Sequence, residues 1–73
     1  RESSCYYIRL GMTVDEVVAI LGTPDSRVYL SGSLPDGRRV GGTTLTYGSC
    51  VVSLFYSEEA RDTVVIDIYD RRK

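Results

Sequence analysis

Two cysteines, Cys5 and Cys50, are the side chains of this chain with the clearest chemistry. If they pair, the bridge closes a loop of about 45 residues and stabilises the fold by about 4 kcal/mol in the chain-entropy model. The alternative is two separate buried thiols, which pack like small apolar side chains. Because the chain has no histidine, the two thiolates alone do not complete a tetrahedral zinc site. We predict a Cys5–Cys50 disulfide, which implies an oxidising, extracytoplasmic compartment.

The other reactive groups do not form a catalytic set. Without histidine the commonest general base is missing, and Cys50 has no partner for nucleophilic catalysis. Asp15 and Glu16 stand at the start of an expected helix, where acidic side chains favour the positive end of the helix dipole. The remaining acidic cluster is typical of a solvated turn: Glu58, Glu59 and Asp62. We therefore predict a protein that is not an enzyme, with no catalytic residue, metal ion or cofactor.

Two groups of basic residues are candidate ligand sites. Arg38 and Arg39 lie close to Gly41 and Gly42 and could hold an anion, but no helix N-terminus follows to form a phosphate cradle. The basic end of the chain, residues 71–73, offers contact with anionic lipid head groups. The net charge of −1 provides no basic face for nucleic acid, and no apolar run reaches transmembrane length. We expect neither nucleic acid nor a small-molecule substrate as ligand.

The elements that must position these groups begin with a helix over Thr13–Leu21. Thr13 is the expected N-cap, and Glu16 completes a capping box. Gly22 supplies the glycine expected after a helix, and Pro24 prevents its continuation. One apolar face follows the helical spacing: Val14, Val17, Val18 and Leu21.

Strands are expected before and after this helix. Alternation predicts an extended Ser4–Leu10 and strands over Arg27–Leu30, Thr43–Tyr47, Cys50–Tyr56 and Thr63–Tyr69. In the last strand, Val64, Ile66 and Ile68 are expected to face the core. The turn between Tyr47 and Cys50, Gly48-Ser49, suits a type II′ hairpin. Ser31–Gly42 is either a long mobile loop or an extension of the strands with a turn at Pro35-Asp36-Gly37.

These elements predict the fold class. With 73 residues, 42% of them hydrophobic, the chain makes one domain over 1–73, with 1–4 and 70–73 expected to fray. A sheet with one apolar face needs a cover, and the helix is the available one. We therefore predict a two-layer α+β fold, with one or two short N-terminal helices packed on a three- to four-stranded antiparallel meander.

The helix also carries a family resemblance. The pattern Gly11-Met12-Thr13, Val17 and Leu21-Gly22-Thr23-Pro24 resembles the signature of the SmpA/OmlA (BamE-like) domain of small bacterial outer-membrane lipoproteins. The same helix-plus-sheet unit is similar to the repeats of the β-lactamase inhibitory protein. The first resemblance implies a protein-binding module at the periplasmic face of the outer membrane, or a secreted one, that supports outer-membrane assembly or envelope integrity. The second implies a secreted or phage-borne inhibitor that inserts the Leu30–Val40 loop into an enzyme.

A binding function directs attention to the aromatic residues. The chain has six tyrosines and no tryptophan, and tyrosine and arginine are enriched at protein–protein contacts. Tyr47 and Tyr56 are expected in the core. The predicted contact with another envelope protein comprises Tyr29, Arg38, Arg39, Phe55 and Tyr69. The alternative is that the tyrosines only cover sheet edges and helix ends. Exposed strand edges offer a second mode, in which a partner adds a strand.

Overall fold

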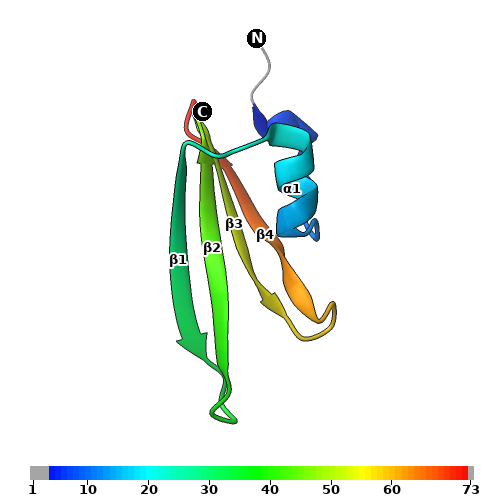
Figure 1. Ribbon diagram of the computed structural model, residues 1–73, viewed down its shortest axis with the longest axis vertical. Coiled ribbons are helices and arrows are strands. Elements are labelled where there is room, and N and C mark those ends of the chain that lie inside the picture. The colour runs from blue at the N-terminus through cyan, green and yellow to red at the C-terminus, as the bar shows by residue number, and fades with distance from the viewer. Residues whose placement is uncertain (1–3, 73) are drawn as a thin grey trace.

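The computed structural model describes residues 4–72, which form a four-stranded antiparallel sheet in the order β1-β2-β3-β4 (Figure 1). A 3-10 helix, η1 (Ser4–Tyr7), and an α-helix, α1 (Val14–Leu21), precede the sheet. The strands are β1 (Ser26–Ser33), β2 (Arg39–Tyr47), β3 (Cys50–Ser57) and β4 (Asp62–Asp70). Each strand pairs with the next in sequence, so the sheet is a simple meander.

The predicted two-layer α+β class is wrong, because strands take up about half of the chain and the helical part is small. A helix of eight residues is about 12 Å long, whereas a strand of nine residues spans about 30 Å. Figure 1 shows α1 over the β4 side of the sheet, at the end away from the β1–β2 turn. The domain is therefore a β-sheet with one short helix on part of one face, and α1 does not make a second layer.

The core lies on the face of the sheet that α1 and the segment before it cover. We call this face the helix side. Its buried cluster draws on the N-terminal segment and on three strands: Ile8, Val17, Leu45, Tyr47, Cys50, Val52, Leu54 and Val65. The Tyr47 hydroxyl donates to the Gly22 carbonyl at 2.7 Å, which joins β2 to the end of α1. Burial raises the pKa of Tyr47.

The predicted ends of the helix are confirmed. The Thr13 hydroxyl accepts a hydrogen bond from the Glu16 amide at 3.2 Å, and the Glu16 carboxylate accepts one from the Thr13 amide at 2.9 Å. The helix ends at Gly22, whose φ of +82° favours glycine. The hairpin turn between β2 and β3 is also as predicted, with a positive φ of +61° at Gly48.

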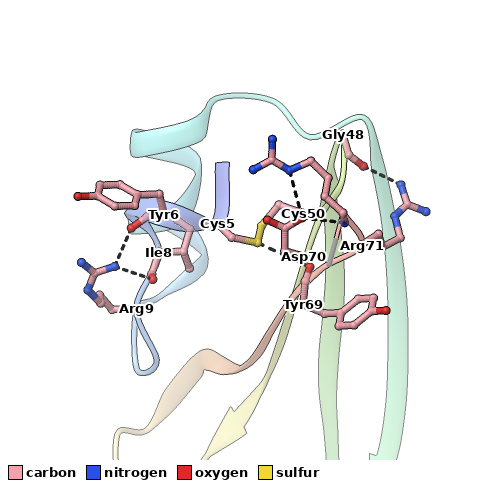
Figure 2. The surroundings of a disulfide bond; sticks show 10 residues. Cys5, Tyr6, Ile8, Arg9, Gly48, Cys50, Tyr69, Asp70 and Arg71 are labelled. Carbon is pink, nitrogen blue, oxygen red and sulfur yellow. Dashed lines mark hydrogen bonds and ion pairs between the residues drawn. A yellow bond between two sulfur atoms is a disulfide. The ribbon is translucent and has the colours of Figure 1, made fainter. Parts of the chain in front are cut away.

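The predicted disulfide joins Cys5 in η1 to Cys50 at the start of β3, with 5.4 Å between the two Cα atoms (Figure 2). The bond is compatible with an extracytoplasmic location. It also pins η1 to the sheet, where we had predicted an extended Ser4–Leu10. That prediction is wrong, because residues Ser4–Tyr7 form a 3-10 helix and the Ile8 amide donates a hydrogen bond to the Cys5 carbonyl at 3.1 Å.

The C-terminal residues also differ from expectation. We predicted fraying from residue 70, yet Asp70 lies in β4 opposite Cys50. The Arg71 amide donates to the Ser49 carbonyl at 2.8 Å, and the Arg71 guanidinium donates to the Gly48 carbonyl at 2.6 Å (Figure 2). The fraying predicted for residues 1–3 and 73 falls outside the described residues.

Of the two alternatives for Ser31–Gly42, the mobile loop is wrong and the extended hairpin is present. β1 runs to Ser33 and β2 starts at Arg39, opposite it. A tight turn joins them, in which the Gly37 amide donates to the Leu34 carbonyl at 2.9 Å. The turn lies at Pro35-Asp36-Gly37, where the hairpin alternative placed it, and the two strands pair up to it.

The last strand has a register shift that alternation did not predict. A β-bulge between β3 and β4 leaves Ile66 without a cross-strand neighbour, so Leu54 pairs with Val65 and Ser53 with Asp67. Val65 is therefore buried in the core, whereas Ile66 is exposed. The predicted inward face of Val64, Ile66 and Ile68 is thus wrong at two positions. Ile66 is exposed, and Val64, although buried, pairs with Phe55 on the opposite face of the sheet. Val65, which we expected to face outward, lies in the core cluster.

Candidate functional site

The face of the sheet opposite α1 is covered by no other element of the described chain (Figure 1). We call it the open face. Side chains alternate along each strand, so the register places Leu30, Gly42, Phe55 and Val64 in one row across its four strands. Open faces of antiparallel sheets usually carry polar side chains. A row without a polar side chain is therefore a candidate contact surface.

Phe55 dominates this surface because its ring lies over a neighbouring strand. A Cβ atom on Gly42 would stand 2.5 Å from Phe55 Cδ1, and one on Gly32 would stand 3.6 Å from Phe55 Cζ. The ring thus crosses β2 and reaches toward β1, in the space that two absent side chains leave. Aromatic cover of this kind protects a glycine in a strand.

Three aliphatic side chains surround the ring position on the same face. Val28 and Leu30 are each 51% exposed, and Val40, opposite Gly32, is half-buried. We define Val28, Leu30, Val40 and Phe55 as the open-face patch. It lies toward the end of the β1–β2 hairpin, away from the disulfide.

The five predicted contact residues do not gather in one place. Phe55 and Tyr69 lie on the open face, two rows apart, because Tyr69 pairs with Val51. Tyr29 and Arg39 belong to the opposite face, since they pair with Thr43 and Ser33. Arg38 precedes β2, in the hairpin turn. The structure therefore splits the predicted surface into two faces and a tip.

Arg38 is held by two acidic residues. Its guanidinium forms ion pairs with Asp36, at 2.8 Å, and with Glu58 of the β3–β4 turn. The hydrogen bond to Glu58, with a second one to Asp36, raises the pKa of Arg38. The backbone amide and then the guanidinium of Arg38 donate to Asp36 and hold the pKa of that carboxyl below its ordinary value. All three side chains are more than half exposed, so these contacts orient the hairpin tip more than they stabilise it.

A hollow lies on the helix side of the sheet, beside the start of α1. It has a volume of about 260 Å³ and is lined by residues that include Val14, Arg27, Tyr29, Thr43 and Thr63. The Arg27 guanidinium lies 5.0 Å from the centre of the Tyr29 ring, a cation–π contact. The helix α1 lies over the β4 side of the sheet and does not cover β1, which leaves this hollow beside β1 (Figure 1). Arg27 and Tyr29, on the edge strand, form part of its lining.

The basic C-terminus does not form a free cationic cluster in the described residues. Arg71 donates to Gly48, and Arg72 lies 3.6 Å from the Asp70 carboxylate. Lys73 lies outside the described residues. In residues 4–72, no group of three or more histidine, cysteine or acidic side chains is placed to hold a metal ion. No described helix is both long and apolar enough to cross a bilayer.

Sequence reasoning found Phe55 but missed its neighbours Val28, Leu30 and Val40. A signal was present in β1, where three apolar residues follow one another as Val28-Tyr29-Leu30 and so occupy both faces of one strand. A strand at the edge of a sheet exposes such a run. A second signal was Gly42 in an otherwise β-prone stretch, since glycine inside a strand indicates a close approach.

Comparison with known proteins adds no relative from which a function would follow. The chain matches no protein-family model, no curated protein and no solved structure.

Proposed function

We propose that this chain is a non-enzymatic protein-binding module of an extracytoplasmic compartment, and that its partner is another envelope protein that docks on the open-face patch. The observation that carries the proposal is the Phe55 ring, which lies against Gly42 and is flanked by half-exposed aliphatic side chains on the face that no other described element covers. Aromatic side chains, phenylalanine among them, are enriched at the centres of protein–protein contacts, where a few large side chains supply most of the binding energy.

Two further features support the compartment and the class of function. The disulfide favours an oxidising environment. The helix pattern from Gly11 to Pro24, which resembles the SmpA/OmlA group, favours the periplasmic face of a bacterial outer membrane. A role in outer-membrane assembly or envelope integrity belongs to this proposal.

The second candidate function is enzyme inhibition by the hairpin tip. Figure 1 shows the β1–β2 turn extending beyond the β3–β4 turn, as an inserting loop would require. The tip is a tight turn over Leu34–Arg38, and Arg38 is already engaged by Asp36 and Glu58. An inhibitor of this kind would present a paired hairpin, the second of the two alternatives for this segment, in place of a mobile loop.

The test compares Phe55→Lys with the matched control Ile20→Lys, which places the same charge on an exposed position of α1. Each variant is checked for folding by circular dichroism, and captured envelope proteins are then purified and titrated against the wild type. We expect Phe55→Lys to weaken binding at least about tenfold, as loss of a central anchor does, and Ile20→Lys to bind like the wild type. If both variants bind the partner as tightly as the wild type does, the open-face patch is not the docking surface. A loss caused only by Arg38→Ala would favour the inhibitor.

A further inference from the structure

The two edges of the sheet differ in how the chain covers them. Along β4, the Gly11 amide donates to the Val65 carbonyl at 2.9 Å, and the Val65 amide donates to the Met12 carbonyl at 2.8 Å. Thr13 forms a bridge with Val64 at the same place. Among the described residues no segment does the same for β1, whose only strand neighbour is β2. The described residues therefore cover the β4 edge at Val64 and Val65 and leave the β1 edge bare.

The bare edge presents backbone groups for pairing. The Val28 carbonyl accepts a hydrogen bond from the Thr43 hydroxyl at 3.0 Å, so it points toward β2. In an antiparallel strand, the amide and carbonyl groups of one residue point to the same side, and those of the next residue point to the opposite side. The corresponding groups of Arg27, Tyr29 and Ser31 consequently point away from the sheet. Three residues in one strand are ready to pair with a further strand.

The side chains of β1 do not prevent such pairing. Natural edge strands are protected by proline, lysine, a bulge or a charge pointing along the edge. The strand has neither proline nor lysine, and its register with β2 is regular from Ser26 to Ser33. Its one charged residue, Arg27, lies over the ring of Tyr29. Tyr29 is 71% exposed, and its neighbours Val28 and Leu30 are half exposed, so the edge is apolar on both faces.

We propose that two copies of this chain pair through β1 in antiparallel orientation, with the two-fold axis at Tyr29, to form a continuous eight-stranded sheet. In this register Tyr29 lies opposite Tyr29 of the second copy, Val28 lies opposite Leu30, and Arg27 lies opposite Ser31. Such a two-fold contact uses the same surface of both copies.

The occupant is a second copy because β1 is complementary to itself. Each apolar side chain meets an apolar one, and each arginine meets a serine, so no like charges face one another. A register centred on Leu30 would place Val28 opposite Gly32 and lose that packing. The formal net charge of −1 gives little long-range repulsion between copies.

The dimer has a consequence for the open face. Val28 and Leu30 point to the open face in both copies, so their side chains meet across the axis and join two open-face patches into one surface. This inference does not rest on the proposed function, since it needs only the edge of β1. Phe55 lies on β3, two strands from the axis, and takes no part in the pairing.

Sedimentation equilibrium of the full chain, from about 1 µM to about 1 mM, tests the proposal. We expect the molar mass to double with concentration, and the Tyr29 amide to become protected from hydrogen exchange as the dimer forms. Tyr29→Lys places two ammonium groups on the axis and should raise the dimer dissociation constant at least about tenfold. Tyr6→Lys is the matched control at another exposed tyrosine and should dimerise like the wild type.

A second variant tests the backbone directly. Ser31→Pro removes an amide that points away from β2, so β1–β2 pairing is retained, while each copy loses one hydrogen bond to the other and the dimer loses two. We expect weaker dimerisation with an unchanged circular dichroism spectrum. A wild type that stays monomeric throughout the concentration range would overturn the proposal. A dimer that survives Tyr29→Lys would do so as well, because the contact would then lie elsewhere.

Discussion

Gly42 is the position where adding a single methyl group should do most damage. A Cβ atom there would stand 2.5 Å from Phe55 Cδ1 and 2.7 Å from the Leu54 carbonyl oxygen. Carbon atoms in contact are normally about 3.5–4.0 Å apart, so the ring would have to move by about 1 Å. The Leu54 oxygen belongs to the β3 backbone and has no such freedom. The clash between the added Cβ atom and the Leu54 oxygen can be removed only if β2 and β3 move apart.

Overpacking of this kind costs about 1–3 kcal/mol. For a domain of this size, a cost of about 2 kcal/mol lowers the unfolding temperature by about 8–16 °C. The measurement is urea and thermal unfolding of Gly42→Ala, followed by circular dichroism. The free energy of unfolding should fall, and the Phe55 ring should leave its position against Gly42.

Gly41→Ala is the matched control, at the adjacent glycine on the other face of β2. A Cβ atom on Gly41 would stand 3.5 Å from the Leu30 carbonyl oxygen, which is an ordinary contact. This variant should unfold at the wild-type temperature or above it, because alanine restricts the unfolded chain. The double variant Gly42→Ala/Phe55→Ala should keep part of the loss, since the clash with the backbone remains. Equal stability of Gly41→Ala and Gly42→Ala would refute the packing that we infer for Phe55.

Three further predictions concern the stability of the fold. Reduction of the disulfide, whose cysteines are 45 residues apart, should cost about 4 kcal/mol. Because a domain of this size has a net stability of only about 3–5 kcal/mol, the reduced chain should lie near its unfolding midpoint at 25 °C by circular dichroism, and a fully folded reduced chain would contradict this. Thr13→Ala should cost about 1 kcal/mol in urea unfolding, whereas Thr13→Ser keeps the capping hydroxyl and should cost less, so equal losses would argue against the cap. The raised pKa of Tyr47 contributes stability that is complete below its unfolded pKa of about 10 and is lost as the pH rises through the folded pKa. Urea unfolding above pH 10 should therefore show a smaller decline in Tyr47→Phe than in the wild type, and parallel declines would assign the effect to other groups.

The candidate site was only partly predictable. Phe55 and Tyr69 were correctly assigned outward from alternation. Tyr29 had no inward assignment in the sequence and is exposed, although it lies on the same face as the core. That these residues do not share one face could not be foreseen, because it depends on which strands pair and in what register. Arg38 was expected to be free for a partner, but Glu58, twenty positions along the chain, lies close enough to bind it. Because the two residues are twenty positions apart, the sequence does not predict that they form an ion pair.

The pair Gly41 and Gly42 shows that the role of a glycine also cannot be predicted from its neighbours in the sequence alone. Gly41 and Gly42 suggested mobility when considered with their chain neighbours alone. In the sheet, Gly42 is buried beneath Phe55, and its lack of a side chain allows the strand to be covered. The same residue type therefore has opposite meanings in a loop and beneath an aromatic ring, and the cross-strand neighbour decides between them.

The sequence by itself determined the features whose causes lie within a few residues of one another. These are the capping box of Thr13 and Glu16, the end of the helix at Gly22 and the tight turn at Gly48. The tertiary structure decided how far β1 extends, that a bulge exposes Ile66, and that one short helix leaves a face and an edge of the sheet bare. The physical reason is that register and cover depend on contacts between segments far apart in the chain, where a shift of one residue exchanges the two faces of a strand.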